Sequence, residues 1–430
     1  MARLEGIRIK NFGILRNVEL GKLWNTQHEK PLSPLTVVIG RNGSGKTTLF
    51  NVFSFLSDCL RVGVQEACDG RGRGGFHRIR SQGEVGPISF ELYYRESLNS
   101  RPITFELSIN ADKSGTAYVE SERLRQRRSG QKKGAPFSFL NLRNGSGVVW
   151  SGEKAIATEK DQTTLDSALS RLSGRLDLSR LNLAEVAETE KIEILDQTRL
   201  AVGNLGVLRQ HPRIIRFRNF VENWYLSFFM PSSARGLPIS GPQKKLNADG
   251  SNLANYVQFL EDRHPDKIES ILEKIAVKIP GLKSIQTSKT EDQRLLLKFC
   301  YKDFDEGHLA QFVSDGTVKL FSYLALLEDP NPPSFLGIEE VENGVYIDVL
   351  PVLMELFREY CGSKTKSTQV FLTTHQPLVA DSLEPDELWI MKKEDDGFSQ
   401  AFRASKQPHV AELVKQGLPM GELWSSNYIG

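Results

Sequence analysis

The chain contains few cysteines and no long apolar run. Its four cysteines are scattered over 430 residues without a C-x-x-C pair, which argues against a zinc ribbon, a redox motif and a disulfide scaffold. No stretch approaches the roughly 18 apolar residues of a membrane-spanning helix. The first residues open into a strand pattern, with no basic region followed by an apolar one. We therefore expect a reduced, cytoplasmic protein with no membrane partner and no secretion signal.

The chain also has a small net charge and no sustained heptad repeat. The formal net charge is +2, so any nucleic-acid binding must come from local basic patches. No apolar heptad pattern persists over several repeats, which argues against a long coiled-coil arm. The residues present, 39% apolar and 25% charged, are typical of globular proteins, and the length suits two or three domains.

One segment has a specific pattern. Residues 40–47 read Gly-Arg-Asn-Gly-Ser-Gly-Lys-Thr and fit G-x-x-x-x-G-K-[ST]. The run 35–39 before them is apolar and β-branched, as in a buried parallel strand, and apolar residues after them recur at helical spacing. The loop therefore precedes a helix N-terminus, whose N–H groups and dipole attract phosphate. We predict that it binds a nucleoside triphosphate, with Lys46 on the β- and γ-phosphates and Thr47 on Mg²⁺. The predicted loop contacts are Gly40, Asn42, Gly43, Ser44, Gly45, Lys46, Thr47 and Thr48.

The first two-thirds of the chain divide into a strand-rich part and a helical part. Residues 1–158 are expected to form an N-terminal lobe, because alternating runs such as 88–94 and 103–109 are typical of antiparallel strands with one wet face. Residues 159–250 are expected to form an inserted helical arm that ends in an irregular connection, 231–250, rich in proline and glycine. The helical spacing of the arm is carried by Leu165, Leu169, Leu172, Leu176, Ile192, Ile194, Leu195 and Leu200.

Residues 251–430 are expected to form a C-terminal lobe. Apolar strands alternate there with helices, which predicts a parallel sheet. The expected strands are 294–301, 334–338, 369–373 and 387–391, and the expected helices begin near 316 and 346.

Two further motifs would act on a bound nucleotide. The apolar run 335–338 ends in Glu339 and Glu340. In a P-loop sheet the strand beside the loop strand delivers its first acid to Mg²⁺ and its second to the attacking water. The run 370–374 ends in His375, whose imidazole can sense the γ-phosphate. A solvated strand end and a hydrogen-bonded turn explain the same residues in isolation, but their order after the loop favours catalysis. We predict that Glu340, His375 and Lys46 are catalytic and that Thr47 and Glu339 bind the metal.

A final motif allows a resemblance to be stated. Residues 314–317, Ser-Asp-Gly-Thr, precede an apolar helical pattern and could simply cap that helix. Together with Asn11-Phe12-Gly13, the loop, and the segments 338–344 and 373–377, they resemble the bacterial ABC-type ATPases related to RecF, SMC and OLD proteins. More narrowly, the chain resembles the compact stand-alone "AAA family ATPases" found in phage-defence operons. The resemblance covers roughly residues 1–110 and 265–395.

This resemblance implies an α/β fold, a P-loop NTPase with an ABC-type head. Such a head combines a mixed N-terminal β lobe with a parallel sheet flanked by helices, and here carries the inserted helical arm. In that family two heads close around two ATP molecules. The phosphate loop of each head faces the signature motif of the other subunit, to which residues 314–317 of this chain correspond. The resemblance therefore implies ATP and Mg²⁺, a homodimer or a multiple of dimers, and nucleotide contacts from Ser314 and Gly316. Three positions depart from the family pattern: Glu339 where Asp is common, Val341 for Pro, and Tyr346 for His.

Two questions stay open at the level of sequence. The family's coupling glutamine has two candidates, Gln65 and Gln82. Two basic runs could contact DNA in a salt-dependent manner, but they lack interleaved aromatics, which favours solvated faces. The runs are Arg71, Arg73, Arg78 and Arg80, and then Arg123, Arg125, Arg127, Arg128, Lys132 and Lys133. The residues after 395 are too few for a nuclease domain, and 394–396 predict an acidic turn.

These observations support three hypotheses. The first is an ATP-hydrolysing sensor or regulatory subunit of an anti-phage defence system, whose effector is encoded separately. The second is a RecF-like repair or recombination ATPase that acts directly on DNA. The third is an ATP-gated scaffold with negligible turnover. A transporter subunit fits less well, because the signature is not Leu-Ser-Gly-Gly.

Overall fold

The computed structural model describes residues 2–127, 136–150, 189–241, 243–276, 279–362 and 368–429. The chain forms two compact units. The first comprises residues 1–33, 41–224 and 391–402, and the second comprises residues 34–40, 225–390 and 403–430.

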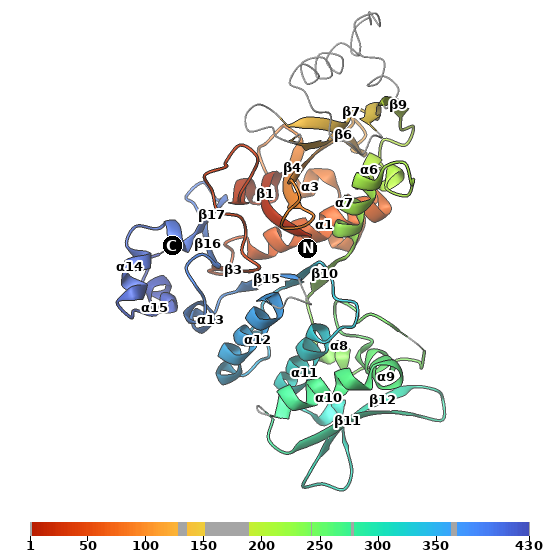
Figure 1. The fold of residues 1–430 in the computed structure, drawn as a ribbon, viewed down its shortest axis with the longest axis vertical. Helices are drawn as coiled ribbons and strands as arrows, with labels where there is room; N and C mark the ends of the chain where they lie inside the picture. Colours follow the sequence, from red (N-terminus) through yellow and green to blue (C-terminus); the bar gives the residue numbers. More distant parts are fainter. Residues whose placement is uncertain are drawn as a thin grey trace, which may run out of the picture. The chain divides into compact units, whose positions relative to one another are not determined.

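The first unit contains an eight-stranded sheet in the order β2-β1-β4-β5-β6-β7-β8-β9 (Figure 1). Every neighbouring pair is antiparallel, as the alternating runs predict. The strands are β1 (Arg3–Phe12), β2 (Leu15–Gly21), β4 (Ile88–Arg95), β5 (Ile103–Ala111), β6 (Ala117–Gln126), β7 (Phe137–Arg143), β8 (Ser146–Trp150) and β9 (Thr189–Glu193).

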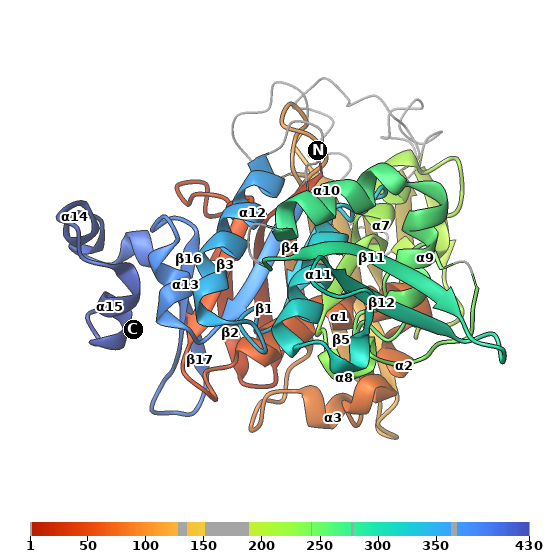
Figure 2. The ribbon, with the colours of Figure 1, turned by 90° about the horizontal axis from the view of Figure 1, so that it is seen from below.

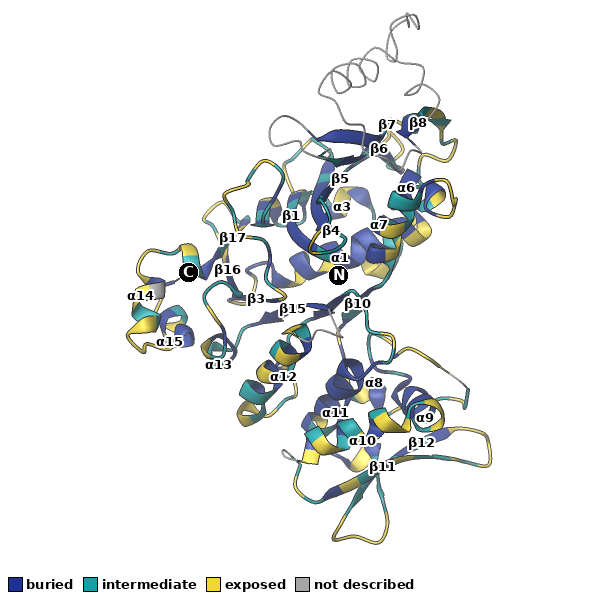
Figure 3. Cartoon of the chain, in the orientation of Figure 1, coloured by how far each residue is buried: buried dark blue, intermediate teal, exposed yellow. Residues whose placement is uncertain are grey.

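Helix α1 (Lys46–Val62) fills the core of this unit with aromatic side chains. The ring of Phe55 lies 5.3 Å from that of Phe12 on β1 and 5.8 Å from that of Phe90 on β4. Figure 3 shows the resulting burial along these strands. The other helices of this unit are α2 (Val64–Asp69), α3 (Phe76–Ile79), α6 (Ala201–Leu205) and α7 (Pro212–Glu222), with a 3₁₀ turn at Gly70–Gly72.

A six-stranded sheet has the order β10-β14-β15-β3-β16-β17. Its centre is parallel: β14 pairs with β15, and β15 pairs with β3. These three strands are buried at every residue, as expected for parallel strands covered on both faces. The strands are β3 (Leu35–Gly40), β10 (Trp224–Ser227), β14 (Phe335–Ile338), β15 (Gln369–Thr374), β16 (Leu388–Lys393) and β17 (Ser399–Arg403).

The second unit also holds a small antiparallel sheet, β11-β12-β13. Helices α9 and α10 pack beside β11 (Figure 2). Helix α11 is largely apolar and almost wholly buried, as expected of a central helix. The strands are β11 (Leu282–Lys289), β12 (Leu295–Tyr301) and β13 (His308–Leu309). The helices are α8 (Pro231–Ala234), α9 (Leu253–Arg263), α10 (Pro265–Ala276), α11 (Asp315–Leu327), α12 (Leu350–Gly362), α13 (Pro377–Asp381), α14 (Val410–Lys415) and α15 (Met420–Ser425). Short 3₁₀ turns lie at Ala310–Phe312, Ile347–Val349 and Ala404–Lys406.

One part of the helical-arm prediction is wrong. Residues 151–188, which include Leu165, Leu169, Leu172 and Leu176, lie outside the described residues. Thr189–Glu193, however, is strand β9, paired with β8, so Ile192 belongs to a strand and not to a helix. Helices resume only at Ala201–Leu205 and Pro212–Glu222. Over the described residues, no helix is both long and apolar enough to cross a membrane.

Candidate functional site

Three predicted site segments leave the central sheet at one edge. Ile338 on β14 is opposite Leu372 on β15, and Thr374 on β15 is opposite Ile39 on β3. Because the strands are parallel, Gly40, which ends β3, lies at the same carboxyl edge as Glu339 and His375, which follow β14 and β15. Ligands bind at this edge in open α/β sheets. The motif predicts that the acid-bearing strand lies beside β3. That prediction is wrong, because β15, which carries the histidine, lies between them.

The phosphate loop requires glycine at two positions with positive φ. Gly43 has φ 78° and Gly45 has φ 102°. A Cβ on Gly45 would lie 2.6 Å from Oγ of Ser399 and 3.0 Å from the Met391 side chain, so even alanine would clash there. The Ser399 hydroxyl donates to the Ser44 carbonyl at 2.7 Å. The loop is thus held in a curved, closely packed form.

The donors of this loop fit a phosphate group. Gly45 is the N-cap of α1, which has no side-chain cap and no acid in its first turn, and the N-terminus of a helix favours an anion. The buried Ser44 hydroxyl has no hydrogen-bond partner within the described part of the chain. Lys46 is 6% exposed, and its Nζ donates to the Arg41 carbonyl at 3.1 Å. Asn42 and Thr47 are exposed and Thr48 is half-buried.

Glu340 has a strained backbone. Its φ is 46°, in the left-handed region that residues with a Cβ seldom adopt. Its N–H donates to Oγ1 of Thr373 at 3.0 Å, and its carbonyl accepts the Asn343 N–H at 2.9 Å. Strain of this kind is typical of functional sites.

Lys319, which sequence analysis missed, holds the same turn. It is 2% exposed, and its Nζ donates to the carbonyls of Asn343 and, at 3.4 Å, of Glu340. Burial lowers the pKa of Lys319 to about 8, although the carboxylates of Glu342 and Glu340 oppose that change. The lysine therefore links helix α11, which begins at the Ser-Asp-Gly-Thr motif, to the turn that carries Glu340.

Glu342 was also missed, and it positions His375. It is 6% exposed, and its Oε1 accepts the backbone N–H of His375 at 2.7 Å. Nδ1 of His375 lies 2.8 Å from the same oxygen, as an electrostatic contact without hydrogen-bond alignment. The imidazole is 38% exposed. The backbone N–H of His375 is thus held by Glu342, while its imidazole remains partly exposed.

The Ser-Asp-Gly-Thr motif both caps α11 and packs closely. Oγ of Ser314 accepts the Thr317 N–H at 3.3 Å, as the capping interpretation predicts. A Cβ on Gly316 would lie 2.9 Å from the Tyr346 ring and 3.2 Å from the Gly344 carbonyl, so this position accepts only glycine without rearrangement. Arg235 fixes the approach to the motif by donating to the carbonyls of Ala310 (3.0 Å) and Val313 (2.5 Å) and by pairing with Asp315 (2.5 Å).

The comparison with protein families agrees with this arrangement. The family described as "AAA domain, putative AbiEii toxin, Type IV TA system" matches residues 35–381, which contain the loop, the signature, the acids and the histidine. The chain belongs to this family. The resemblance to ABC-type AAA ATPases stated from the motifs is thereby confirmed, and so is the α/β P-loop fold. No curated protein matches the chain.

Several solved structures are similar at low identity. A structure titled as an SmcHead bound to the C-winged helix domain of ScpA shares 13% identity, with 93% of this chain and 96% of that chain covered and a TM-score of 0.48. The SMC head domain from Thermotoga maritima shares 13%, with 93% and 98% covered and a TM-score of 0.40. An Smc head domain derived from Pyrococcus furiosus shares 13%, with 96% and 100% covered and a TM-score of 0.47.

The two candidate glutamines of this AAA domain differ in their contacts. Gln65 is engaged on both sides, donating to Asp69 at 2.6 Å and accepting the Ala117 N–H. Gln82 is exposed and directly follows Ser81, whose hydroxyl donates to the Gly13 carbonyl at 2.7 Å. A Cβ on Gly13 would lie 2.9 Å from the Thr48 side chain. Gln82 therefore follows a turn that packs on the start of α1.

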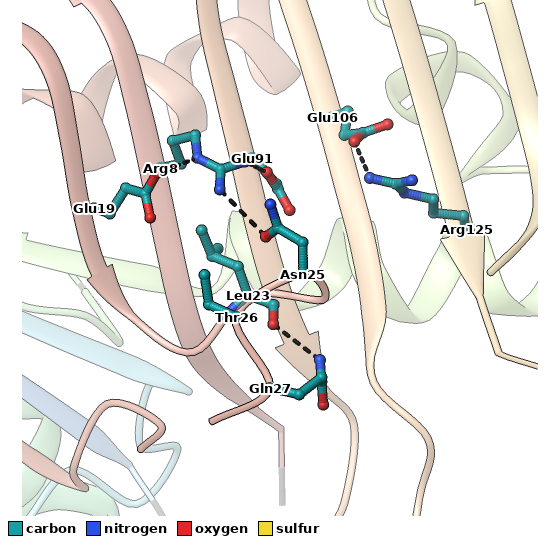
Figure 4. Close-up of polar contacts among 9 residues, drawn as sticks. All are labelled: Arg8, Glu19, Leu23, Asn25, Thr26, Gln27, Glu91, Glu106 and Arg125. Carbon is teal, nitrogen blue, oxygen red and sulfur yellow. Dashed lines mark hydrogen bonds and ion pairs between the residues drawn. The ribbon is translucent and has the colours of Figure 1, made fainter. Parts of the chain in front are cut away.

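Arg125, in the denser basic run, does not lie on a solvated face. Arg125 on β6 is 6% exposed, pairs with Glu106 on β5 and stacks over the Trp24 ring at 4.4 Å. Figure 4 shows it in a row of charges across the sheet that includes Arg8 and Glu91. Arg128, Lys132 and Lys133 lie outside the described residues. Arg71 and Arg73, from the other run, both pair with Asp58, at 2.8 and 2.9 Å.

Proposed function

We propose that this AAA-family chain binds ATP with Mg²⁺ and hydrolyses it to ADP and phosphate. We further propose that it acts in the cytoplasm as the sensor or regulatory subunit of an anti-phage defence system with a separately encoded effector. The observation that carries the proposal is that β3, β14 and β15 end at one edge of the sheet, and that the phosphate loop, Glu340 and His375 come directly after these strands in the sequence.

Each residue has a role in this proposal. The α1 N-terminus and Lys46 hold the phosphates, and Glu340 accepts the proton of the attacking water. His375, anchored by Glu342, orients that water. Thr47 and Glu339 are oxygen donors of the kind that Mg²⁺ prefers, and the ion would neutralise charge on the phosphates. Among the described residues no group of three or more His, Cys, Asp or Glu could hold a metal by itself, which agrees with an Mg²⁺ held partly by ATP. Gln82 is the better candidate for the coupling glutamine.

The same proposal includes a second copy of the chain. Three large apolar side chains are exposed near the signature: Phe312 (79%), Tyr346 (65%) and Ile347 (57%). Apolar groups gathered at one place commonly mark interaction sites. Ser314, which is exposed at the N-cap of α11, and Gly316, which is buried beside Tyr346, would then face the nucleotide of the partner copy.

The defence role rests on the family. Its description names an AbiEii toxin and a type IV toxin–antitoxin system, and the motif set resembles phage-defence ATPases. Direct action on DNA through residues 123–133 is the weaker alternative, because Arg125 is engaged within the sheet.

The test measures ATP turnover and solution mass together for the wild type, Glu340→Gln and Lys46→Ala, with and without duplex DNA. We expect turnover by the wild type, ATP binding and an accumulated dimer without turnover for Glu340→Gln, and no ATP binding for Lys46→Ala. Equal turnover by the wild type and Glu340→Gln would remove the base role. Stimulation of ATP turnover by DNA would favour the DNA-repair alternative. ATP-dependent dimerisation of the wild type without turnover would favour the ATP-gated scaffold.

A further inference from the structure

The end of the chain packs against the segment that follows His375. Helix α13 (Pro377–Asp381) begins two residues after this histidine, and α15 (Met420–Ser425) packs against α13 in the same unit (Figure 2). A helix of five residues is too short to be stable alone, so the position of α13 depends on the elements around it. We call residues 419–429, which include α15, the carboxyl-terminal segment.

The two helices meet backbone to backbone at Gly421. A Cβ on this residue would lie 2.2 Å from the carbonyl oxygen of Pro377 and 2.6 Å from its carbonyl carbon. Gly421 does not have a positive φ, so lack of space, and not backbone conformation, requires glycine here. Because both neighbouring atoms belong to the backbone, no rotation of a side chain could make room for a methyl group. Any side chain at this position must therefore move α15 away from Pro377.

Asp381 makes a second contact between these helices. Its Oδ1 accepts the N–H of Gly421 at 2.7 Å. Gly421 is the second residue of α15, and the N-cap of that helix, Pro419, makes no side-chain cap. A capping oxygen normally accepts the N–H at this position, so Asp381 caps α15 from the neighbouring helix. The acid is also the last residue of α13, where the dipole of its own helix disfavours a negative charge.

Apolar side chains hold both partners of this contact. Met420, Leu423 and Ile429 of the carboxyl-terminal segment are buried, and so are Val379 and Ala380 of α13. The N–H of Ile429 also donates to the Leu423 carbonyl at 3.3 Å. The carboxyl-terminal segment is therefore a packed element of the second unit, and α13 rests on it.

The backbone on both sides of the imidazole has a support. Glu342 accepts the N–H of His375 at 2.7 Å. Two residues later, Pro377 has no N–H to donate, and Gly421 packs against its carbonyl group. One support thus comes from the turn after β14 and the other from the carboxyl-terminal segment. A shift of the second support would turn the backbone at His375 and, with it, the imidazole.

We propose that the carboxyl-terminal segment positions His375 through the contacts that Gly421 and Asp381 make with α13. This inference rests on the ATPase function proposed above, in which His375 orients the attacking water. Gly421 and Asp381 act through that histidine and are positioning residues. Displacement of the segment from α13 slows ATP turnover and leaves ATP binding unchanged.

The experiment compares Gly421→Ala with a matched control, Gly362→Ala. Gly362 ends α12 in the same unit, and a Cβ there would have nothing within 4 Å, so the control adds the same methyl group without a clash. Asp381→Ala removes the acceptor of the Gly421 N–H, whereas Asp381→Asn keeps an amide oxygen in its place. Steady-state kinetics and nucleotide titration are measured for each protein, and thermal melting shows that each variant is folded.

We expect kcat to fall by about tenfold in Gly421→Ala and Asp381→Ala, since small displacements of a catalytic group have effects of this size, with ATP affinity unchanged. Asp381→Asn should restore turnover, and Gly362→Ala should not alter it. In a His375→Ala background, Gly421→Ala should cause no further loss, because residues that act through one another are not additive. A normal kcat in Gly421→Ala, or an equal further loss without the histidine, overturns the inference.

Hydrogen exchange at residues 375–383 gives a readout that does not need turnover. We expect faster exchange there in Gly421→Ala and not in Gly362→Ala. If the wild type does not hydrolyse ATP, the ATPase proposal fails, while faster exchange in Gly421→Ala still supports the link between the carboxyl-terminal segment and His375. Equal exchange in all the proteins overturns that link, whatever the turnover.

Discussion

At the scale of single residues, the turn after β14 contains Glu340, whose backbone is strained and whose carbonyl accepts a hydrogen bond from the buried Lys319. A left-handed backbone at Glu340 costs about 1–3 kcal/mol. The contacts from Thr373, Asn343 and Lys319 offset that cost. If the strain directs the carboxylate, losing the lysine should impair catalysis more than ATP binding.

Lys319→Met tests this. We expect turnover to fall by about tenfold or more, since misplacing a catalytic group has effects of this size, while ATP affinity is retained. Because the folded pKa is lowered from 10.5 to about 8, the unfolded chain binds more protons between these values. The free energy of unfolding of the wild type should therefore rise with pH across that window, and the variant should lose that rise. Steady-state kinetics, nucleotide titration and denaturation at several pH values measure these effects.

The control for this variant is Lys274→Met, which removes a lysine paired with Glu328 in the same unit. Normal turnover by Lys319→Met would show that the turn keeps its geometry without the lysine.

Glu122 provides a second test, in which the free energy of unfolding should change with pH in the opposite direction. Its carboxylate accepts the N–H groups of Ala201 and Val202 at 2.6 and 2.8 Å, and burial raises its pKa from 4.5 to about 7. Between these values the native state keeps a proton that the unfolded chain has lost. The free energy of unfolding should therefore decrease as pH rises from 4.5 to 7, by on the order of 3 kcal/mol, and then level off.

Glu122→Gln should remove this decrease. The measurement is urea unfolding at several pH values, compared with Glu120→Gln on the same strand, where Glu120 is only partly buried. A pH profile shared by Glu122→Gln and the wild type would rule out Glu122 as its source.

At the scale of elements, strands with continuous apolar runs were predictable and the edge strand was not. β3, β14 and β15 are buried on both faces, so their sequences are apolar at nearly every position. β9 reads Thr-Glu-Lys-Ile-Glu and is mostly exposed, so its stability comes from pairing with β8 and not from its own composition. The spacing of two between Ile192 and Ile194 was the signal for a strand.

The residues of the candidate site also divide into those that could be predicted from sequence and those that could not. The loop could be found from sequence because its chemistry fixes both residue types and spacing. Lys319 and Glu342 act through burial and contacts made by separate elements, which a linear motif does not encode. A signal did exist for Lys319: it is the one charged residue between Val318 and Leu327 in an otherwise apolar helix, and a lysine there must find partners.

The segment that precedes α11, residues 310–314, gives a third prediction. Arg235→Ala removes the donors to the carbonyls of Ala310 and Val313 and the pair with Asp315. We expect a loss of about 1–3 kcal/mol of stability and faster hydrogen exchange at residues 310–316, with no change in α9. Arg294→Ala, which removes an exposed arginine paired with Asp292, is the control. Unchanged exchange at 310–316 would show that Arg235 does not order the signature.

At the scale of the whole molecule, the exposed apolar residues near the signature predict how copies associate. Replacing Phe312 and Tyr346 by serine should weaken ATP-dependent self-association by about tenfold or more, because central aromatic residues dominate interface energies. Solution mass against protein concentration measures this. Phe304→Ser is the control, since Phe304 is 60% exposed in the same unit. Equal dimerisation by all variants would place the interface elsewhere.

The bond between Ser399 and the Ser44 carbonyl joins residues 355 positions apart, and β3 is flanked by β15 and β16, which come late in the chain. A ribosome must therefore reach Ser399 before the phosphate loop at residues 40–47 can be completed. Because domains fold as units, the nascent chain lacks a completed phosphate loop until these late strands have been made. Messages cut short before Ser399 would yield products in which the loop cannot take its observed form.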